Sequence, residues 1–187
     1  QWELGWNHGA HRLIYSAPNY MFAHDSYDRP TAKARREMAE MTAAAVVEPD
    51  IWQCPTFYLA ERSTRDPSVI RMVARAPTKL VIDADDPFDA GGSAGFRLLD
   101  APKGITITNV SIDANDPHTV LLHLSDVPKG DGLRVAYAYG ADPRTGKFPA
   151  NCGAVRDQWS LTSATGRNLH RWALPCVLPL TAGGGDA

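Results

Sequence analysis

The stretch Arg12-Leu-Ile-Tyr-Ser-Ala-Pro-Asn-Tyr-Met-Phe22, followed by His24-Asp-Ser-Tyr-Asp-Arg-Pro30 and an alanine-rich segment that runs to Val47, decides the expected fold of the first third of the chain. Its apolar first part suits a short buried strand that leaves the sheet through a loop at Pro18. In α/β enzymes, a strand that ends in a loop with carboxylates and histidines, followed by a helix, presents reactive side chains. We therefore expect an α/β strand-loop-helix unit here.

The segment from residue 31 to residue 47 has the pattern of an amphipathic helix. Thr31 is a suitable N-cap, and Pro49 ends the pattern. Apolar residues at helical spacing are expected on one core-facing side, namely Ala34, Met38, Met41 and Ala45. Two pairs of opposite charge, four residues apart, are expected on the exposed side, namely Lys33 with Glu37 and Arg36 with Glu40.

From Ser68 onward the period changes from helical to alternating. Short β-branched or aromatic runs occur at residues 69–73, 80–82, 105–112, 120–124, 133–139 and 168–179. Turn signals such as Asp86-Pro and Asp116-Pro separate them. This pattern favours an antiparallel β-sandwich, with a β-bulge near Asn109 and with prolines protecting a sheet edge in the last run. The chain as a whole is expected to be mainly β.

Three segments are expected along the chain. Residues 1–63 would form the α/β fragment, including an aromatic connector at residues 51–60. Residues 64–182 would form the β-sandwich domain, and the glycine-rich residues 183–187 would form a flexible tail.

Composition narrows the class of partner and cofactor. A net charge of -2 and a pI near 6.3 provide no basic surface for phosphates, which argues against nucleic acid. No apolar run is long enough to span a bilayer, so no membrane span is expected.

Gly91-Gly-Ser-Ala-Gly95 lacks the strand and helix that flank a phosphate-binding loop, and we expect no nucleotide, haem or flavin cofactor. His8 and His11 have no carboxylate or cysteine nearby to complete a metal site, so no metal is expected.

The three cysteines, Cys54, Cys152 and Cys176, are widely spaced and odd in number. Such spacing fits neither a disulfide framework nor a zinc knuckle, and it favours buried free thiols. A bridge between Cys152 and Cys176 stays open as an alternative, if two strands of the later part lie side by side.

The segment of residues 13–31, the alanine-rich helix and the terminal Asn168-Leu-His-Arg-Trp-Ala-Leu-Pro together resemble the C-terminal portion of an SGNH (GDSL-type) hydrolase with an appended β-sandwich, as in bacterial and phage-encoded carbohydrate esterases. The family's last motif is Asp-x-x-His, in which the histidine is the base for a serine nucleophile and the aspartate orients it. Asp25 falls on the aspartate, Asp28 stands at the histidine position, and His24 is adjacent. The nucleophile motif does not occur in this chain, so the resemblance implies a missing N-terminal part of the hydrolase domain or a partner chain that supplies it.

Two functions are therefore weighed. The first is the C-terminal part of an ester hydrolase that acts on acylated polysaccharide, with Asp25, His24 and Asp28 as candidate catalytic residues. The alternative explanation of this loop is a solvated turn whose carboxylates cap the helix. The second is a non-catalytic carbohydrate-binding or assembly module of a phage tail or cell-surface protein. Its candidate sugar-stacking residues are Trp159, Tyr139 and Trp172, which core packing would explain equally well. Both functions imply a polysaccharide or glycan partner and an extracellular, cell-surface or virion-associated location.

Overall fold

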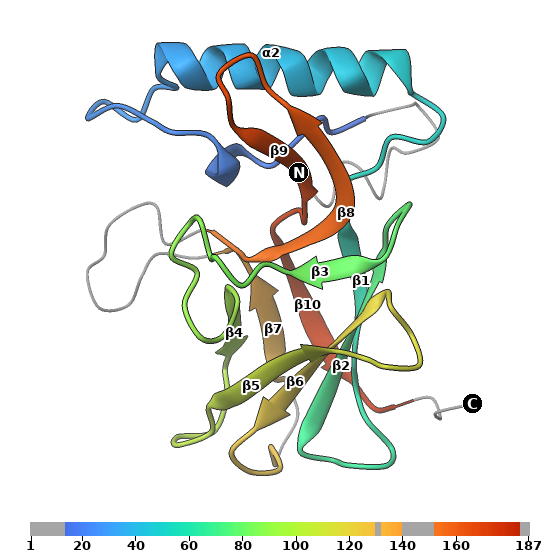
Figure 1. The fold of residues 1–187 in the computed structure, drawn as a ribbon. Coiled ribbons are helices and arrows are strands. Elements are labelled where there is room, and N and C mark those ends of the chain that lie inside the picture. The colour runs from blue at the N-terminus through green and yellow to red at the C-terminus, as the bar shows by residue number, and fades with distance from the viewer. Residues whose placement is uncertain (1–13, 130–131, 140–151, 184–187) are drawn as a thin grey trace.

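The computed structural model describes residues 14–129, 132–139 and 152–183, which form two β-sheets and one long helix (Figure 1). In chain order the elements are η2 (Asn19–Met21), α2 (Ala32–Val47), β1 (Thr56–Arg62), β2 (Val69–Arg75), β3 (Leu80–Ile82), β4 (Phe96–Leu99), β5 (Ile107–Ile112), β6 (Thr119–Leu124), β7 (Arg134–Tyr137), β8 (Val155–Thr162), β9 (Asn168–Trp172) and β10 (Cys176–Thr181). The expectation of a mainly β chain is confirmed.

The larger sheet has seven strands in the order β4-β7-β10-β1-β2-β6-β5. Its neighbours are antiparallel except for β1 and β10, which run parallel. The outermost strands β4 and β5 contact each other, so the sheet is nearly closed on itself rather than one face of an open sandwich. The pairing of β5 with β6 shifts register between Ile107 and Asn109, which confirms the predicted bulge.

The smaller sheet has the order β3-β8-β9. The last run, predicted as one edge strand at residues 168–179, is instead divided: β9 belongs to the smaller sheet and β10 to the larger one. The division falls at residues 173–175, where the Leu174 amide donates to the Pro55 carbonyl and Pro175 has no N–H to donate. β10 also lies between β7 and β1 rather than at an edge, and its parallel pairing with β1 begins at Leu180, directly after Pro179.

The inside of the nearly closed sheet is an aromatic and aliphatic core. The rings of Phe57, Phe96 and Tyr137 are mutually packed, with centroids 4.8 to 5.4 Å apart. Alternating apolar residues of β2 and β6, including Ile70 and Leu122, are completely buried around them. Burial of such side chains stabilises the fold by about 1.5 to 3 kcal/mol each, which explains why the alternating sequence pattern predicts these strands well.

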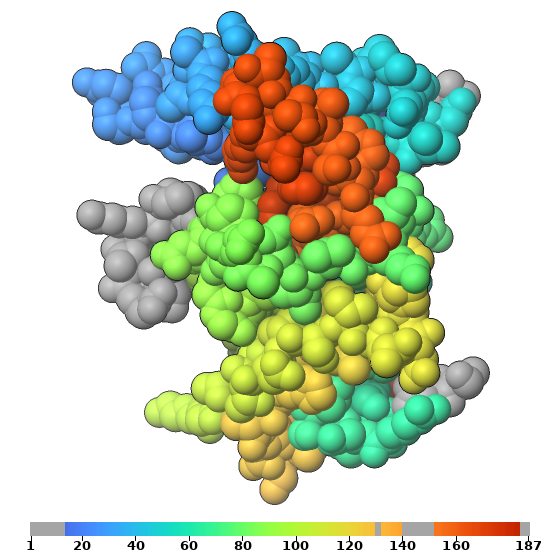
Figure 2. All heavy atoms as spheres, viewed as in Figure 1, coloured from blue at the N-terminus to red at the C-terminus, as the bar shows by residue number. Residues whose placement is uncertain are grey.

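A second core joins α2 to the β8–β9 hairpin, over which the helix lies in Figure 1. Its buried residues are Met21, Phe22, Ala34, Met41, Ala45, Trp52, Leu169 and Trp172. Thr31 caps the helix as predicted, since its Oγ1 accepts a hydrogen bond from the Ala34 amide at 3.2 Å. The surface view in Figure 2 shows the helix and the hairpin in direct contact.

The predicted exposure of Glu37 is wrong. Its side chain is 2% exposed and accepts hydrogen bonds from Thr165 Oγ1 at 2.8 Å and Arg167 Nη1 at 3.1 Å. Glu40 Oε1 accepts from the Ala164 amide in the same hairpin turn. Partners about 125 residues away in the sequence therefore outcompete the local lysine and arginine, whose pairing with glutamate on a helix surface is weak.

The strand predicted within residues 13–22 is absent from the described part of that segment, residues 14–22. These residues form an irregular stretch and the short helix η2. The Tyr15 carbonyl accepts hydrogen bonds from Trp52 Nε1 at 3.2 Å and Cys54 Sγ at 3.5 Å, and so its partners are side chains instead of a neighbouring strand. Met21 and Phe22 are buried against α2. The segment is thus apolar because it packs under a helix, not because it lies in a sheet.

The predicted aromatic connector at residues 51–60 contains the first part of β1. Residue 63, the predicted boundary, lies in the turn between β1 and β2, and these two strands are paired from Thr56 to Arg62. The three cysteines are buried and free, so the predicted free thiols are confirmed and no Cys152–Cys176 bridge forms.

Candidate functional site

The loop of residues 23–31 is a compact turn. The Asp25 amide donates to the Arg29 carbonyl at 2.8 Å, and the Thr31 amide donates to the Ala23 carbonyl at 3.0 Å. Asp28 has a φ of 59°, a left-handed conformation that aspartate tolerates better than most residues. The sequence places a turn here correctly because Asp, Ser and Pro favour one.

The Asp25 carboxylate holds this turn together. Its Oδ1 accepts from the amides of Tyr27 at 2.9 Å and Arg29 at 3.0 Å, and its Oδ2 accepts from Arg29 Nε at 3.3 Å. The backbone hydrogen bond from Arg29 is the main reason why the pKa of Asp25 is lowered. The Asp25 carboxylate is exposed and bonds to groups of its own loop, whereas Thr31 caps the amides of the helix. The loop is therefore a solvated turn, which was the alternative to a catalytic loop, but its carboxylates do not cap α2.

The other candidate catalytic residues lie in the same turn. His24 Nε2 is 3.3 Å from Asn19 Nδ2, and Asp28 is exposed at the tip. The structure therefore brings His24, Asp25 and Asp28 together on one short loop, but Asp25 is bonded to Arg29 and Tyr27.

The three candidate sugar-stacking residues are not arranged as one exposed surface. Trp172 is 2% exposed and packs edge-on against Phe88, with centroids 4.8 Å apart. Trp159 is half-buried and packs edge-on against Trp52 at 4.8 Å. Tyr139 is 54% exposed, after β7 turns at Ala138, whose φ is 46°. Trp172 is thus a core residue, and only Tyr139 is freely accessible.

A buried ion pair adjoins Trp159. Asp157 on β8 is fully buried, and its Oδ2 lies 2.6 Å from Nη2 of Arg171 on β9. The guanidinium of Arg171 lies 5.6 Å from the ring centroids of both Trp52 and Trp159, so it is a cation–π partner of both. The sequence analysis missed this pair. The sequence pattern of β8 could have indicated it, because Asp157 lies two residues after buried Val155 and therefore on the same face of the strand.

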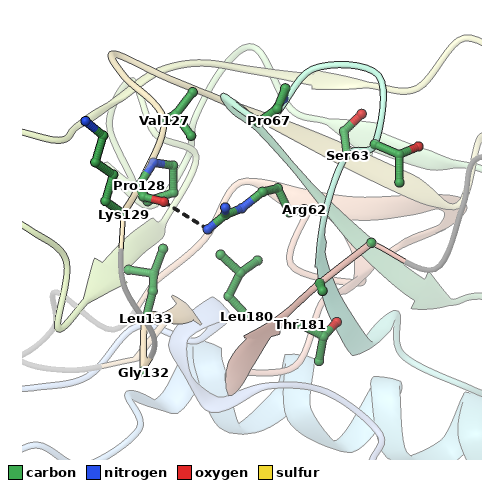
Figure 3. Close-up of a pocket in the computed structure, with 13 residues that line it drawn as sticks. Arg62, Ser63, Pro67, Val127, Pro128, Lys129, Gly132, Leu133, Leu180 and Thr181 are labelled. Carbon is green, nitrogen blue, oxygen red and sulfur yellow. Dashed lines mark hydrogen bonds between the residues drawn. The ribbon is translucent and has the colours of Figure 1, made fainter.

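A pocket with a volume of about 730 Å³ opens at the end of the larger sheet (Figure 3). It lies between the β1–β2 turn, the connection from β6 to β7, and the residues after β10. Its lining consists of Arg62, Ser63, Thr64, Pro67, Val127, Pro128, Lys129, Gly132, Leu133, Leu180, Thr181, Ala182 and Gly183. Apolar, hydroxyl and basic groups therefore share one concave surface.

Arg62 occupies the middle of this pocket (Figure 3). It extends from the end of β1 and donates from Nη2 to the Pro128 carbonyl at 2.9 Å, across the opening. Gly183 lies against the Arg62 carbonyl so closely that a Cβ there would be 2.1 Å from the carbonyl oxygen. Sequence reasoning missed the pocket because its walls come from segments more than sixty residues apart, and no local motif marks it.

Comparisons with known proteins do not assign the chain to a family. No known family model and no curated protein matches it. Among solved structures, the N-terminal part of the bacterial S-layer protein SbsC is similar, with 11% sequence identity and a TM-score of 0.41. The similarity covers 83% of this chain and 30% of that one, so this chain spans less than a third of that structure's length. So distant a likeness carries no functional argument.

Two further observations concern metals and membranes. Within the ranges that the structure describes, no group of three or more His, Cys, Asp or Glu side chains is arranged to hold a metal ion. His8 and His11 lie outside those ranges. The described helices include none with the length and hydropathy that a bilayer crossing requires.

Proposed function

We propose that this chain is a non-catalytic carbohydrate-binding module of a larger cell-surface or virion-associated protein, and that the pocket around Arg62 is its binding site. The observation that carries the proposal is the mixed lining of this pocket. Carbohydrates present hydroxyl groups and apolar C–H faces, and small-molecule sites combine an apolar wall with a few well-placed polar groups.

The lining meets this requirement with defined hydrogen-bonding roles. Ser63 Oγ accepts from the amides of Arg65 and Asp66, each at 3.3 Å, so its own O–H proton can be donated to a ligand. Thr181 Oγ1 donates to the Ala60 carbonyl at 3.0 Å, so its oxygen can accept from a ligand hydroxyl. Leu133 and Leu180 provide the apolar wall.

The hydrolase hypothesis stays a prediction from the family resemblance. Its Asp25 is held by four donor contacts from its own turn, two of them from the Arg29 side chain, and a catalytic aspartate needs instead to orient a histidine. The turn geometry therefore supports the non-catalytic function better.

Binding to a panel of neutral and acidic polysaccharides, measured by calorimetry, tests the proposal. We expect at least one polysaccharide to bind, and we expect Arg62→Gln to weaken that binding. Arg35→Gln is the matched control, because Arg35 Nη1 also donates to a proline carbonyl, Pro30, but on the exposed side of α2. Absence of binding across the panel, or equal loss in both variants, would rule the proposed site out. Ester hydrolysis that Asp25→Ala abolishes would instead favour the hydrolase.

A further inference from the structure

The described side chains that line the pocket around Arg62 include two cations and no anion, whereas the protein as a whole is negatively charged. Among its described lining residues, the ionisable side chains are Arg62 and Lys129, and both are cationic. The whole chain has a net charge of -2. A local excess of positive charge inside a concave site attracts an anionic group, because low-dielectric walls strengthen the field.

We infer, resting on the proposed function, that this site selects acidic glycans and that the Arg62 guanidinium receives a sugar carboxylate. A guanidinium is a rigid planar fork with five N–H donors, and it matches the two oxygens of a carboxylate. The bond from Nη2 to the Pro128 carbonyl uses part of this capacity and fixes the orientation of the group. Because the Arg62 side chain is already held in one orientation, it loses less conformational entropy when a ligand binds, and the site is preorganised.

The rest of the pocket fits the remainder of such a sugar. Leu180 and Leu133 lie below the guanidinium in Figure 3; the half-buried Leu180 offers the apolar surface that a sugar ring would contact, and Leu133 is buried beside it. Ser63 has a proton to donate, and Thr181 has an oxygen that can accept, so both can bind ring hydroxyls. Lys129 adds a second positive charge at the rim. This combination suits a hexuronate or another carboxylated sugar better than an isolated inorganic anion, which would leave the apolar wall unused.

Calorimetric titration of the full chain with three hexasaccharides of matched length tests the inference. The probes are a neutral hexose oligomer, a hexuronate oligomer and a sulfated oligomer. We expect the hexuronate to bind at least about tenfold more tightly than the neutral oligomer, because each charge-assisted hydrogen bond contributes more than a neutral one. We also expect the affinity to fall as salt is raised, since ions screen this attraction.

Variants then separate the roles of charge and geometry. Arg62→Gln should remove about tenfold or more of the hexuronate affinity and leave neutral binding nearly unchanged. Arg62→Lys should recover only part of it, because lysine retains the charge without the fork. Arg35→Gln should bind like the wild type. Thermal unfolding of each variant checks the fold, and Ser63→Ala serves as a second pocket variant if Arg62→Gln is unstable.

The outcomes distinguish this inference from the proposed function. Equal affinity for the neutral and hexuronate oligomers, both weakened by Arg62→Gln, would overturn the selection of acidic sugars while the binding module stands. Tighter binding of the sulfated oligomer than of the hexuronate would overturn the assignment of a carboxylate. No binding of any oligomer would overturn the proposed function itself.

Discussion

Arg171 Nη2 lies 2.6 Å from Asp157 Oδ2, and the two side chains are 3% and 0% exposed. The contact joins β9 to β8 beneath two tryptophan rings, so the charges are paired in a region of low dielectric. Asp157 Oδ2 and Arg171 Nε have no aligned hydrogen-bond partner among the described residues, and attraction between the charges is what holds the two groups together there.

Removing one partner of this pair should destabilise the protein strongly. Asp157→Asn or Arg171→Met leaves a buried charge uncompensated, which costs about 3 to 5 kcal/mol. The double variant should lose less than the sum of the two single losses, because it buries no unpaired charge. Urea unfolding of the four proteins measures this cycle, and additive losses would contradict the pairing.

Glu37 should anchor the β8–β9 hairpin to α2. Glu37→Ala removes the carboxylate that accepts from Thr165 and Arg167, while Arg167 Nη1 keeps its bond to the Met21 carbonyl, and we expect a loss of about 1 to 3 kcal/mol in the free energy of unfolding. Amide hydrogen exchange should accelerate at Ser163 and Gly166 in the hairpin turn. The matched control is Glu48→Ala, because Glu48 is exposed at the C-terminal end of the same helix. Equal effects from both variants would argue against the anchor.

The buried thiols should make the protein less stable at alkaline pH. Burial raises the pKa of Cys54 to about 12 and that of Cys176 to about 12, from the ordinary value of 9.0 for a thiol. Above pH 9 the unfolded thiols lose their protons while the folded ones keep them, so the free energy of unfolding decreases as pH rises from about 9 toward 12. Urea unfolding between pH 8 and 11 measures this slope, and Cys54→Ala should flatten it. An unchanged slope would mean that Cys54 is not protected by burial.

Gly153 should tolerate no side chain. A Cβ at this position would lie 2.2 Å from the ring of Tyr137, which is completely buried and packed against Phe57 and Phe96. We expect Gly153→Ala to cost about 1 to 3 kcal/mol, as overpacked cores do. Gly92→Ala is the control, because a Cβ there meets open space. A melting temperature as high as the control's would show that the Tyr137 ring can shift.

The Asp25 turn should lose its order in acid. Because the folded pKa is lowered from 3.8, the carboxylate supports the turn above that value and the support is lost as pH falls through the folded pKa. The amide resonances of Tyr27 and Arg29 should therefore titrate together at a pH below 3.8. In Asp25→Ala the same amides should exchange faster at neutral pH, with little change in global stability. Titration at or above 3.8 would show that the amides do not stabilise the anion.

Local periodicity predicts part of this fold well. The strand at residues 80–82 is found with those bounds, and those near residues 69–73 and 120–124 differ only at their ends. The α2 helix also follows its predicted pattern, because Thr31 and the apolar face depend on neighbours within a few residues.

Features that depend on distant partners escape such prediction. The burial of Glu37 is decided by Arg167, and the apolar segment before α2 packs under a helix instead of entering a sheet. β4 follows a glycine-rich turn and is only four residues long, which gives too little alternation to recognise. The pocket was missed for the same reason, since Arg62 and Pro128 meet only in the folded chain.

The central place of β10 has a consequence for how this protein is made. Residues 176–181 fill the gap between β7 and β1, and Ala60 pairs with Leu180. While a ribosome is still synthesising the residues before Cys176, β1 and β7 lack this neighbour and keep unpaired backbone groups. The larger sheet can therefore be completed only after these last strand residues have emerged, and a nascent chain that stalls earlier would present two open sheet edges to chaperones and to other chains.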